Sequence, residues 1–287
     1  MLEQYGEALT EEIFAGMNGT RRTTLRANAL KTTVEAVGEA LTGAGIAWEK
    51  APFYADAFIL TDADERALRA LPMYENGEIY VQGLSSMLPP LALAPHEKAD
   101  ILDMAAAPGS KTTQIAALTH NRAQLTACEI NKIRADRLRH NLSLQGARAS
   151  VMERDARKLE DFFRFDQILL DAPCSGSGTL LLSKPETTRA FSEALVKNSA
   201  MLQKALLQKA LTILKTGGEM VYSTCSILRA ENEEVIRTAL KSRKAELVPI
   251  TPPDGLPLLP TSLNGCICVK PTELYEGFFM AKLRKVK

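Results

Sequence analysis

Short apolar segments alternate with helical segments from about residue 97 onward, and this alternation limits the fold more than any other feature of the sequence. It predicts βαβ units and a mostly parallel sheet that helices cover on both faces. The expected strands are 101–104, 124–128, 149–152, 167–170 and 219–222, and the expected helices are 111–118, 131–144 and 195–214. Ligands bind at the carboxyl ends of such strands, near the switch in strand order. The residues that follow each strand are therefore the candidate site.

The first part of the chain has a different pattern. A strand is expected at 24–28 and an amphipathic helix at 33–41, with glycines after it. Strand candidates lie within 48–60 and at 79–81. The sequence therefore predicts a small α+β unit over residues 1–92 and a larger α/β domain over residues 93–287.

Three consecutive strand ends suit one kind of ligand. The first strand leads into a turn of small residues: Ala105, Ala106, Ala107, Pro108, Gly109, Ser110 and Lys111. Such a turn lets the backbone approach a ligand, but it is neither a P-loop nor a GxGxxG loop. Glu129, at the second strand end, could accept two ribose hydroxyls, and Asp155, after the third, could accept an adenine amino group. Together they indicate an adenosine-bearing ligand without phosphates. S-adenosylmethionine fits, and adenosine alone stays open.

Two cysteines follow the last two expected strands. Cys174 lies in the segment that begins at Asp171, and Cys225 comes directly after the fifth strand. Both would face the cleft that holds the ligand. An odd total of five cysteines argues against a disulfide framework. Cys266 and Cys268 could suggest a metal, but a second pair is missing, so buried small side chains are the favoured interpretation and no metal is expected.

Nearly all of the chain resembles the RNA cytosine-5 methyltransferases of the bacterial RsmB/RsmF and eukaryotic NSUN kind. The motifs that carry the resemblance are LDMAAAPGSKTTQIA, LLDAPCSGSGT, KPE at 184–186, VYSTCSI with ENEEV after it, GFFMAKL, LRANALK and IYVQGLSSMLP. The resemblance implies a Rossmann-like S-adenosylmethionine-dependent methyltransferase sheet with a small N-terminal α+β RNA-binding domain. A minimal form without the extra N-terminal helical domain or the C-terminal RNA-binding domain of some relatives is expected, so their substrate choice is not expected to carry over.

The resemblance also implies a role for each candidate residue. Cys225, in the Thr-Cys motif, would be the nucleophile, whereas DNA cytosine methyltransferases use the Pro-Cys cysteine. Cys174 would help release the product, and Lys111 and Asp171 would lie near the target base. The residues implied to hold S-adenosylmethionine are Ala105, Ala106, Ala107, Pro108, Gly109, Ser110, Lys111, Glu129, Asp155 and Asp171.

These residue types suit the implied reaction. Carbon 5 of cytosine is too weak a nucleophile to attack a sulfonium methyl group directly, but addition of a thiolate to carbon 6 produces an enamine with electron density at carbon 5. A hydrogen bond or proton from Asp171 to N3 would favour that addition, and Lys111 is a cation that would favour the thiolate. The target must leave its stack, so a single-stranded or loop cytosine of ribosomal or transfer RNA is expected.

Net charge and hydropathy bear on partners and location. A formal net charge of +1 excludes a strongly basic protein but allows local basic patches for RNA. Two patches are candidates: Arg21, Arg22, Arg26 and Lys31, and Lys282, Arg284, Lys285 and Lys287. No apolar run approaches the roughly 20 residues of a membrane span, and no signal peptide is evident. A cytoplasmic protein without a membrane partner is expected, with a monomer favoured.

Two other function classes remain. An N-methyltransferase would need polar groups around a lone pair and no cysteine pair. An RNA-binding assembly factor could retain a decayed methyltransferase fold. The cysteine pair counts against the first class, and the intact acidic and cysteine positions count against the second.

Overall fold

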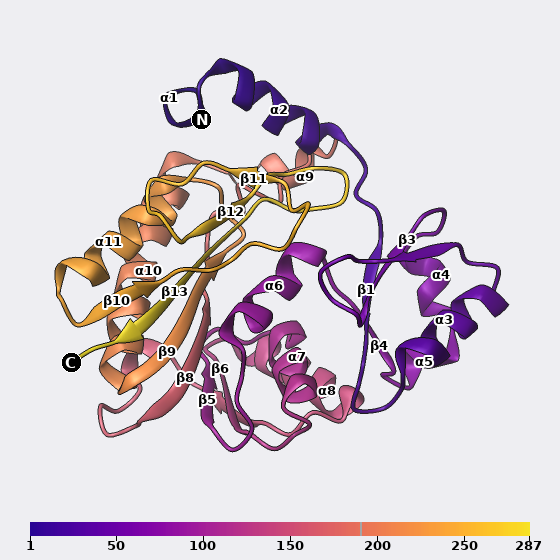
Figure 1. Cartoon of the computed structure of the whole chain (residues 1–287), viewed down its shortest axis with the longest axis horizontal. Helices are drawn as coiled ribbons and strands as arrows, with labels where there is room; N and C mark the ends of the chain where they lie inside the picture. Colours follow the sequence, from indigo (N-terminus) through magenta and orange to yellow (C-terminus); the bar gives the residue numbers. More distant parts are fainter. Residues whose placement is uncertain (190) are drawn as a thin grey trace.

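The computed structural model describes residues 1–189 and 191–287, and it holds two sheets (Figure 1). The smaller sheet is antiparallel, in the order β2-β3-β1-β4. Its elements are β1 (Thr24–Ala27), β2 (Trp48–Lys50), β3 (Ala57–Leu60) and β4 (Ile79–Val81), with α3 (Val34–Gly43), α4 (Glu65–Arg69) and α5 (Pro72–Glu75). The strands expected near 24 and 79 and the helix near 33 are confirmed. The segment 48–60 holds two paired strands with a turn between them.

The larger sheet contains the parallel core that the sequence predicts. Its parallel strands are β5 (Asp100–Asp103), β6 (Gln124–Glu129), β7 (Ser150–Glu153), β8 (Phe165–Asp171) and β9 (Leu214–Thr224). Their order in the sheet is β9-β8-β5-β6-β7, so the order reverses beside β5. The α/β fold class is confirmed, and the carboxyl ends of β5, β6, β7, β8 and β9 lie along one edge of the sheet.

Antiparallel strands extend this sheet beyond β9. They are β10 (Ala245–Val248), β11 (Leu258–Leu259), β12 (Ile267–Val269) and β13 (Phe278–Lys285). The pairing of β13 with β9 joins residues about sixty positions apart, such as Met280 and Ser223. Because that pairing is non-local, strand periodicity around residue 219 does not indicate it.

Helices cover both faces of the large sheet, as expected. The elements around it are α6 (Leu84–Leu93), α7 (Ser110–Leu118), α8 (Lys132–Gln145), η1 (Ala156–Lys158), α9 (Pro185–Thr188), α10 (Glu193–Ile213), η2 (Arg229–Glu231) and α11 (Glu233–Lys241). Ile101 of β5 packs with Ile115 of α7, whereas the next residue, Leu102, packs with Leu207 of α10. Side chains alternate between faces along a strand, so this pattern shows that both faces are buried.

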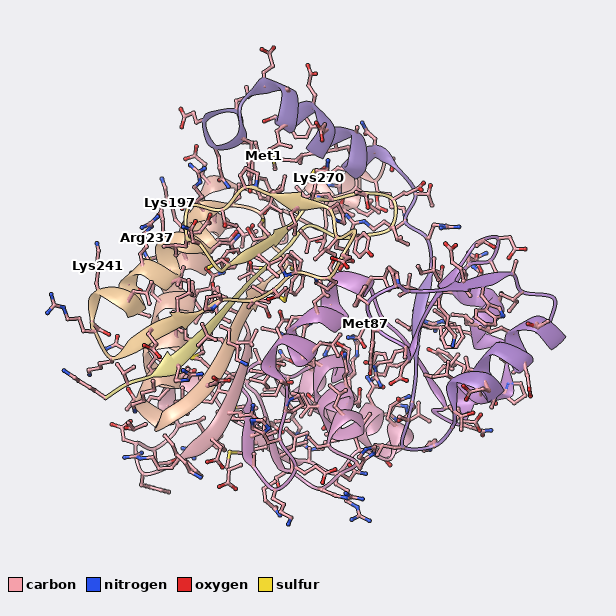
Figure 2. The ribbon with its side chains drawn as sticks, viewed as in Figure 1. Met1, Met87, Lys197, Arg237, Lys241 and Lys270 are labelled. Atoms are coloured by element: carbon pink, nitrogen blue, oxygen red, sulfur yellow. The ribbon has the colours of Figure 1, made fainter. Side chains whose placement is uncertain are left out.

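The N-terminal helices and the small sheet both pack on the larger domain. α1 (Leu2–Tyr5) and α2 (Glu7–Asn18) lie away from the small sheet in Figure 1, and Ile13 and Met17 enter the large core. On the other side, Met87 of α6 packs with Ile59 of β3 and Phe278 of β13. Figure 2 shows Met87 between the large sheet and the small one. The two sheets therefore share buried apolar contacts.

In the described part of the chain, helices long and apolar enough to cross a membrane are absent.

Candidate active site

The turn after β5 brings the backbone close to α8. Gly109 has a φ of 111°, and a Cβ at this position would lie 3.0 Å from the Cδ1 of Leu138. Glycine is therefore required here for both backbone and space. Ala106 and Ala107 are buried against Leu138, whereas Ala105 lines a cavity at the ends of β5, β6 and β7. Of the predicted turn residues, Pro108 and Ser110 line a different cavity, between the small sheet and α8.

Glu129 forms one wall of the cavity lined by Ala105. It ends β6 and is only 4% exposed. One of its oxygens accepts a hydrogen bond from the Asn131 N–H at 2.9 Å, and the other lies 3.4 Å from Arg134. Ile130, which is 62% exposed, also lines this cavity. The cavity thus combines a buried carboxylate with an exposed apolar side chain, which suits a ligand with a diol next to a flat ring.

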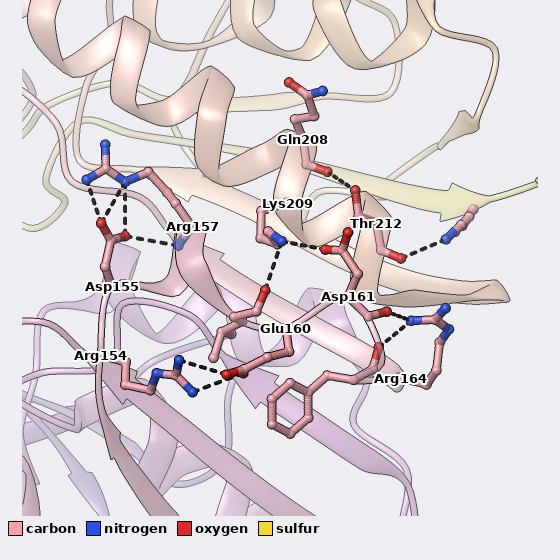
Figure 3. A network of polar contacts seen from close by, with 12 residues as sticks. Arg154, Asp155, Arg157, Glu160, Asp161, Arg164, Gln208, Lys209 and Thr212 are labelled. Atoms are coloured by element: carbon pink, nitrogen blue, oxygen red, sulfur yellow. Dashed lines mark hydrogen bonds and ion pairs between the residues drawn. The ribbon is translucent and has the colours of Figure 1, made fainter.

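Asp155 lies on the same cavity, but a neighbour holds its carboxylate (Figure 3). The guanidinium of Arg157 donates to both oxygens at distances from 2.6 to 3.1 Å, and the Arg157 N–H donates to one of them. These hydrogen bonds hold the pKa of Asp155 below its usual range. A ligand amino group here would share the carboxylate with Arg157 or displace its side chain.

Lys111, in the first turn of α7, and Asp171, at the end of β8, form an ion pair in which the lysine is buried and the aspartate is half-buried. The Lys111 Nζ lies 2.7 Å from Asp171 and donates to the Ser86 Oγ at 2.8 Å. The Ser223 hydroxyl donates to the other oxygen of Asp171 at 2.8 Å. Burial lowers the pKa of Lys111, but the charges of Asp171, Asp103 and Cys225 outweigh it, so the pKa is raised. Lys111 therefore stays charged and lies close enough to Cys225 to interact with a thiolate there.

Asp103 lies beneath this ion pair and is 1% exposed. The Thr112 hydroxyl donates to its Oδ2 at 2.7 Å, while its Oδ1 is buried without a hydrogen-bond partner. Burial, with a smaller contribution from Asp171, raises the pKa of Asp103 to about 6. Besides Asp171, the site thus holds a buried carboxyl group, that of Asp103, which is costly to ionise.

The two cysteines of the strand ends meet. Cys225 follows β9 and Cys174 follows β8, and their Sγ atoms lie 3.0 Å apart. The contact with Cys225, together with burial, raises the pKa of Cys174 well above its usual range. Cys174 is therefore favoured as a thiol, within hydrogen-bond reach of the Cys225 sulfur.

Three polar residues of this site were missed from the sequence: Ser86, Ser223 and Glu231. Ser86 contacts Lys111 from α6, and Ser223 contacts Asp171 from β9. Glu231 is completely buried and bonds to the residues after both cysteines. Glu231 lies within ENEEV, where a carboxylate among other acids gives no local signal.

Cys266 and Cys268, considered above as a metal pair, lie in or beside the large core. Over residues 1–189 and 191–287, the side chains form no group of three or more His, Cys, Asp or Glu that could hold a metal ion.

Two family models match this chain. The family model for 16S rRNA methyltransferase RsmB/F matches residues 90–284, and that for the RsmF/B-like ferredoxin-like domain matches residues 1–65. The ribosomal RNA small subunit methyltransferase F of Shewanella halifaxensis is 35% identical over 96% of this chain and 61% of its own length. That of Pectobacterium atrosepticum is 36% identical over 96% of this chain and 59% of its own length. The chain thus spans about three fifths of the length of these relatives.

Solved structures agree with the fold. The crystal structure of a methyltransferase homolog protein from Pyrococcus horikoshii has a TM-score of 0.86 and 34% identity, over 99% of this chain and 92% of that one. That of NSun6 from Pyrococcus horikoshii with SFG has a TM-score of 0.87 and 24% identity, over 100% and 96% of the two chains, and supports the fold alone. With a family model matched over most of its length, this chain belongs to the RsmB/F family of 16S rRNA methyltransferases.

Proposed function

We propose that this protein transfers a methyl group from S-adenosylmethionine to carbon 5 of a cytosine in RNA, with Cys225 as the covalent nucleophile. One observation carries the proposal: the Sγ atoms of Cys225 and Cys174 lie 3.0 Å apart, at strand ends that also hold the Lys111–Asp171 ion pair. A thiol pair beside a buried cation suits addition to a pyrimidine and serves no purpose in direct transfer to a nitrogen lone pair. The cysteine pair therefore favours cytosine C5 over an N-methyltransferase.

The cavity at the ends of β5, β6 and β7 supports S-adenosylmethionine as the methyl donor. The buried carboxylate of Glu129 suits the two ribose hydroxyls, and the exposed Ile130 suits one face of the adenine. The carboxylate of Asp155 would accept a hydrogen bond from the adenine amino group in addition to those that Arg157 donates to it. When bound, the cofactor supplies an electrophilic methyl group, and the protein residues orient it toward Asp171 and the cysteines.

The reaction on the base begins at Cys225. Its thiolate forms a bond to carbon 6, and the electrons of the C5–C6 double bond shift through carbon 4 toward N3. The charge of Lys111, and a proton that Lys111 shares with N3 through Asp171, stabilise them there. The cofactor would supply the methyl group that carbon 5 takes up, and the bond from that methyl group to the sulfonium sulfur would break with its electrons left on sulfur. A base removes the proton from carbon 5, the S–C6 bond breaks, and the thiolate of Cys225 returns. Cys174 acts in this last elimination.

Small-subunit ribosomal RNA is the first substrate to test, because the relatives are named for it. Full-length protein would be incubated with radiolabelled S-adenosylmethionine and either 16S rRNA or total transfer RNA. We expect label in 16S rRNA, and bisulfite sequencing should locate it at one or a few unpaired cytosines. Cys225→Ala should reduce the rate by at least about 100-fold while calorimetry shows cofactor binding retained.

Three results would contradict parts of the proposal. Label in transfer RNA alone would move the substrate to that class. Label released as a methylated nitrogen on nucleoside analysis would exclude C5 chemistry. Cofactor binding with no transfer to either RNA would favour the assembly-factor alternative.

A further inference from the structure

Glu231 is a buried carboxylate that the reaction above does not use. It ends η2, six residues after Cys225, and its exposed fraction is 0%. Burying a carboxylate is costly unless hydrogen bonds satisfy it. Each oxygen of Glu231 accepts two hydrogen bonds, and all four donors are neutral groups. A charge held at this cost without a cation among these donors points to a role beyond stability.

The hydrogen bonds of Glu231 reach both cysteine loops. The residue after Cys174 is Ser175, whose N–H and hydroxyl donate to Glu231 at 2.7 and 2.6 Å. The residue after Cys225 is Ser226, whose hydroxyl donates at 2.6 Å. One carboxylate thus ties together two loops about fifty residues apart in the chain.

Gln203 of α10 closes the connection from the other side. Its side-chain amide donates to Glu231 at 3.3 Å and to the Pro173 carbonyl, just before Cys174, at 2.9 Å. Glu231 and Gln203, which are hydrogen-bonded to each other, therefore hold the peptide groups on both sides of Cys174.

We propose that Glu231 is a positioning residue that holds the Cys174 and Cys225 loops at the spacing at which both thiols act on one cytosine. This inference rests on the proposed function for its last clause, but the spacing itself can be tested without RNA. The negative charge of Glu231 has a second effect. The contact with Cys225 and burial are the larger causes that raise the pKa of Cys174, and the charge of Glu231 is the smallest of them.

Two substitutions separate the effect of the Glu231 hydrogen bonds from the effect of its negative charge. Glu231→Ala removes all four hydrogen bonds. Glu231→Gln keeps the side-chain size: its amide oxygen can accept from the Ser175 N–H and from Gln203, while its NH₂ donates to serine hydroxyls that turn to accept. Glutamine should therefore keep much of the spacing but lose the charge. Glu233→Gln is the matched control, because Glu233 is also buried nearby but accepts from Ser262, away from both cysteines.

The first measurement uses phenylarsine oxide, which captures two thiols only when they lie close together. Full-length protein would be treated without RNA, and mass spectrometry would locate the captured pair. Wild type, Glu231→Gln and Glu233→Gln should bridge Cys174 and Cys225, and Glu231→Ala should not. Bridging by the alanine variant at the wild-type rate would overturn the proposal, whether or not the protein methylates RNA.

The second measurement follows alkylation of Cys174 by iodoacetamide as a function of pH. Loss of the charge in Glu231→Gln should move the profile to lower pH, and Glu233→Gln should leave it where wild type has it. An unchanged profile in Glu231→Gln would contradict the electrostatic part, and this holds even if Glu231→Ala fails to fold.

The third measurement is single-turnover methyl transfer to the RNA that wild type methylates. Glu231→Ala should lose on the order of 100-fold, the typical cost of misplacing reacting groups by about 1 Å, while cofactor affinity stays unchanged. Glu231→Gln should recover part of that loss. Absence of transfer by wild type would count against the proposed function alone, whereas transfer by Glu231→Ala at the wild-type rate would count against the positioning role alone.

Discussion

At the scale of single residues, the chemistry depends on how two thiols divide the work. The Sγ–Sγ contact and the raised pKa of Cys174 are consistent with Cys174 as the thiol and Cys225 as the thiolate that attacks. The proximity of Lys111 to Cys225 supports the same assignment. Trapping of a covalent RNA–protein adduct tests which of the two cysteines attacks carbon 6.

Cys174→Ala should accumulate an RNA–protein adduct. If Cys225 attacks carbon 6 and Cys174 acts in elimination, loss of Cys174 leaves addition and methyl transfer intact but slows release of the RNA. The adduct would be measured on a denaturing SDS gel with labelled RNA.

Matched variants show which cysteine forms the bond. Cys225→Ala and the double variant should give no adduct, and Cys128→Ala, a buried cysteine of β6, should behave like wild type. An adduct with Cys225→Ala in place of Cys174→Ala would reverse the assignment.

At the scale of elements, Asp103 at the end of β5 lowers the stability of the folded protein in a pH-dependent way. Burial raises the pKa of Asp103 from 3.8 to about 6 in the folded protein. Below both values the carboxyl is protonated in both states and costs nothing, and above both it is charged in both states while the folded state bears the penalty. Stability therefore falls as the pH rises from 3.8 to about 6.

Asp103→Asn should remove this dependence. Relative to wild type, the free energy of unfolding of the variant should rise by about 2 kcal/mol between about pH 4 and about pH 7. Urea unfolding at both pH values measures it. Asp100→Asn, on the same strand with a side chain 48% exposed, serves as the control and should show little of this change. A wild-type-like pH dependence in Asp103→Asn would mean that Asp103 titrates normally.

At the scale of the whole molecule, a buried arginine connects the small sheet to helix α7 of the large domain. Arg26 of β1 is 0% exposed and donates to Gln82 and to Thr113 of α7 at 3.3 and 3.1 Å. Its Nη1 is buried without a partner, and burial lowers the pKa of its guanidinium. Arg26 belongs to the first basic patch expected from the sequence, but its burial removes it from any surface that RNA could contact in this structure.

Arg26→Ala should loosen the small sheet from the large domain. We expect the free energy of unfolding to fall by about 2–5 kcal/mol, as for other large buried side chains, and thermal unfolding to show the small sheet melting first. Arg22→Ala, an arginine of the same patch with a surface ion pair to Glu49, should change stability by less than about 1 kcal/mol. A single unchanged transition in Arg26→Ala would show that the shared apolar core around Met87 alone couples the two units.

Sequence patterns predicted the parallel strands, most of the helices between them and the residues at the strand ends. Strand and helix periodicities are local, so the parallel strands, their helices and the strand-end residues such as Glu129 and Cys225 could be read along the chain. The motifs also indicated the family that the comparison confirmed. The predicted domain boundary at residue 92 stays a prediction, as do the residue roles.

The tertiary structure decided which of these residues meet. The pairing of β13 with β9, the place of α2 on the large core, the approach of Ser86 to Lys111 and the tie from Glu231 to both cysteine loops join residues far apart in sequence. Local pattern carries no information about such contacts, because they depend on how whole elements pack. The same packing buried Arg26, which the sequence could only count as a positive charge.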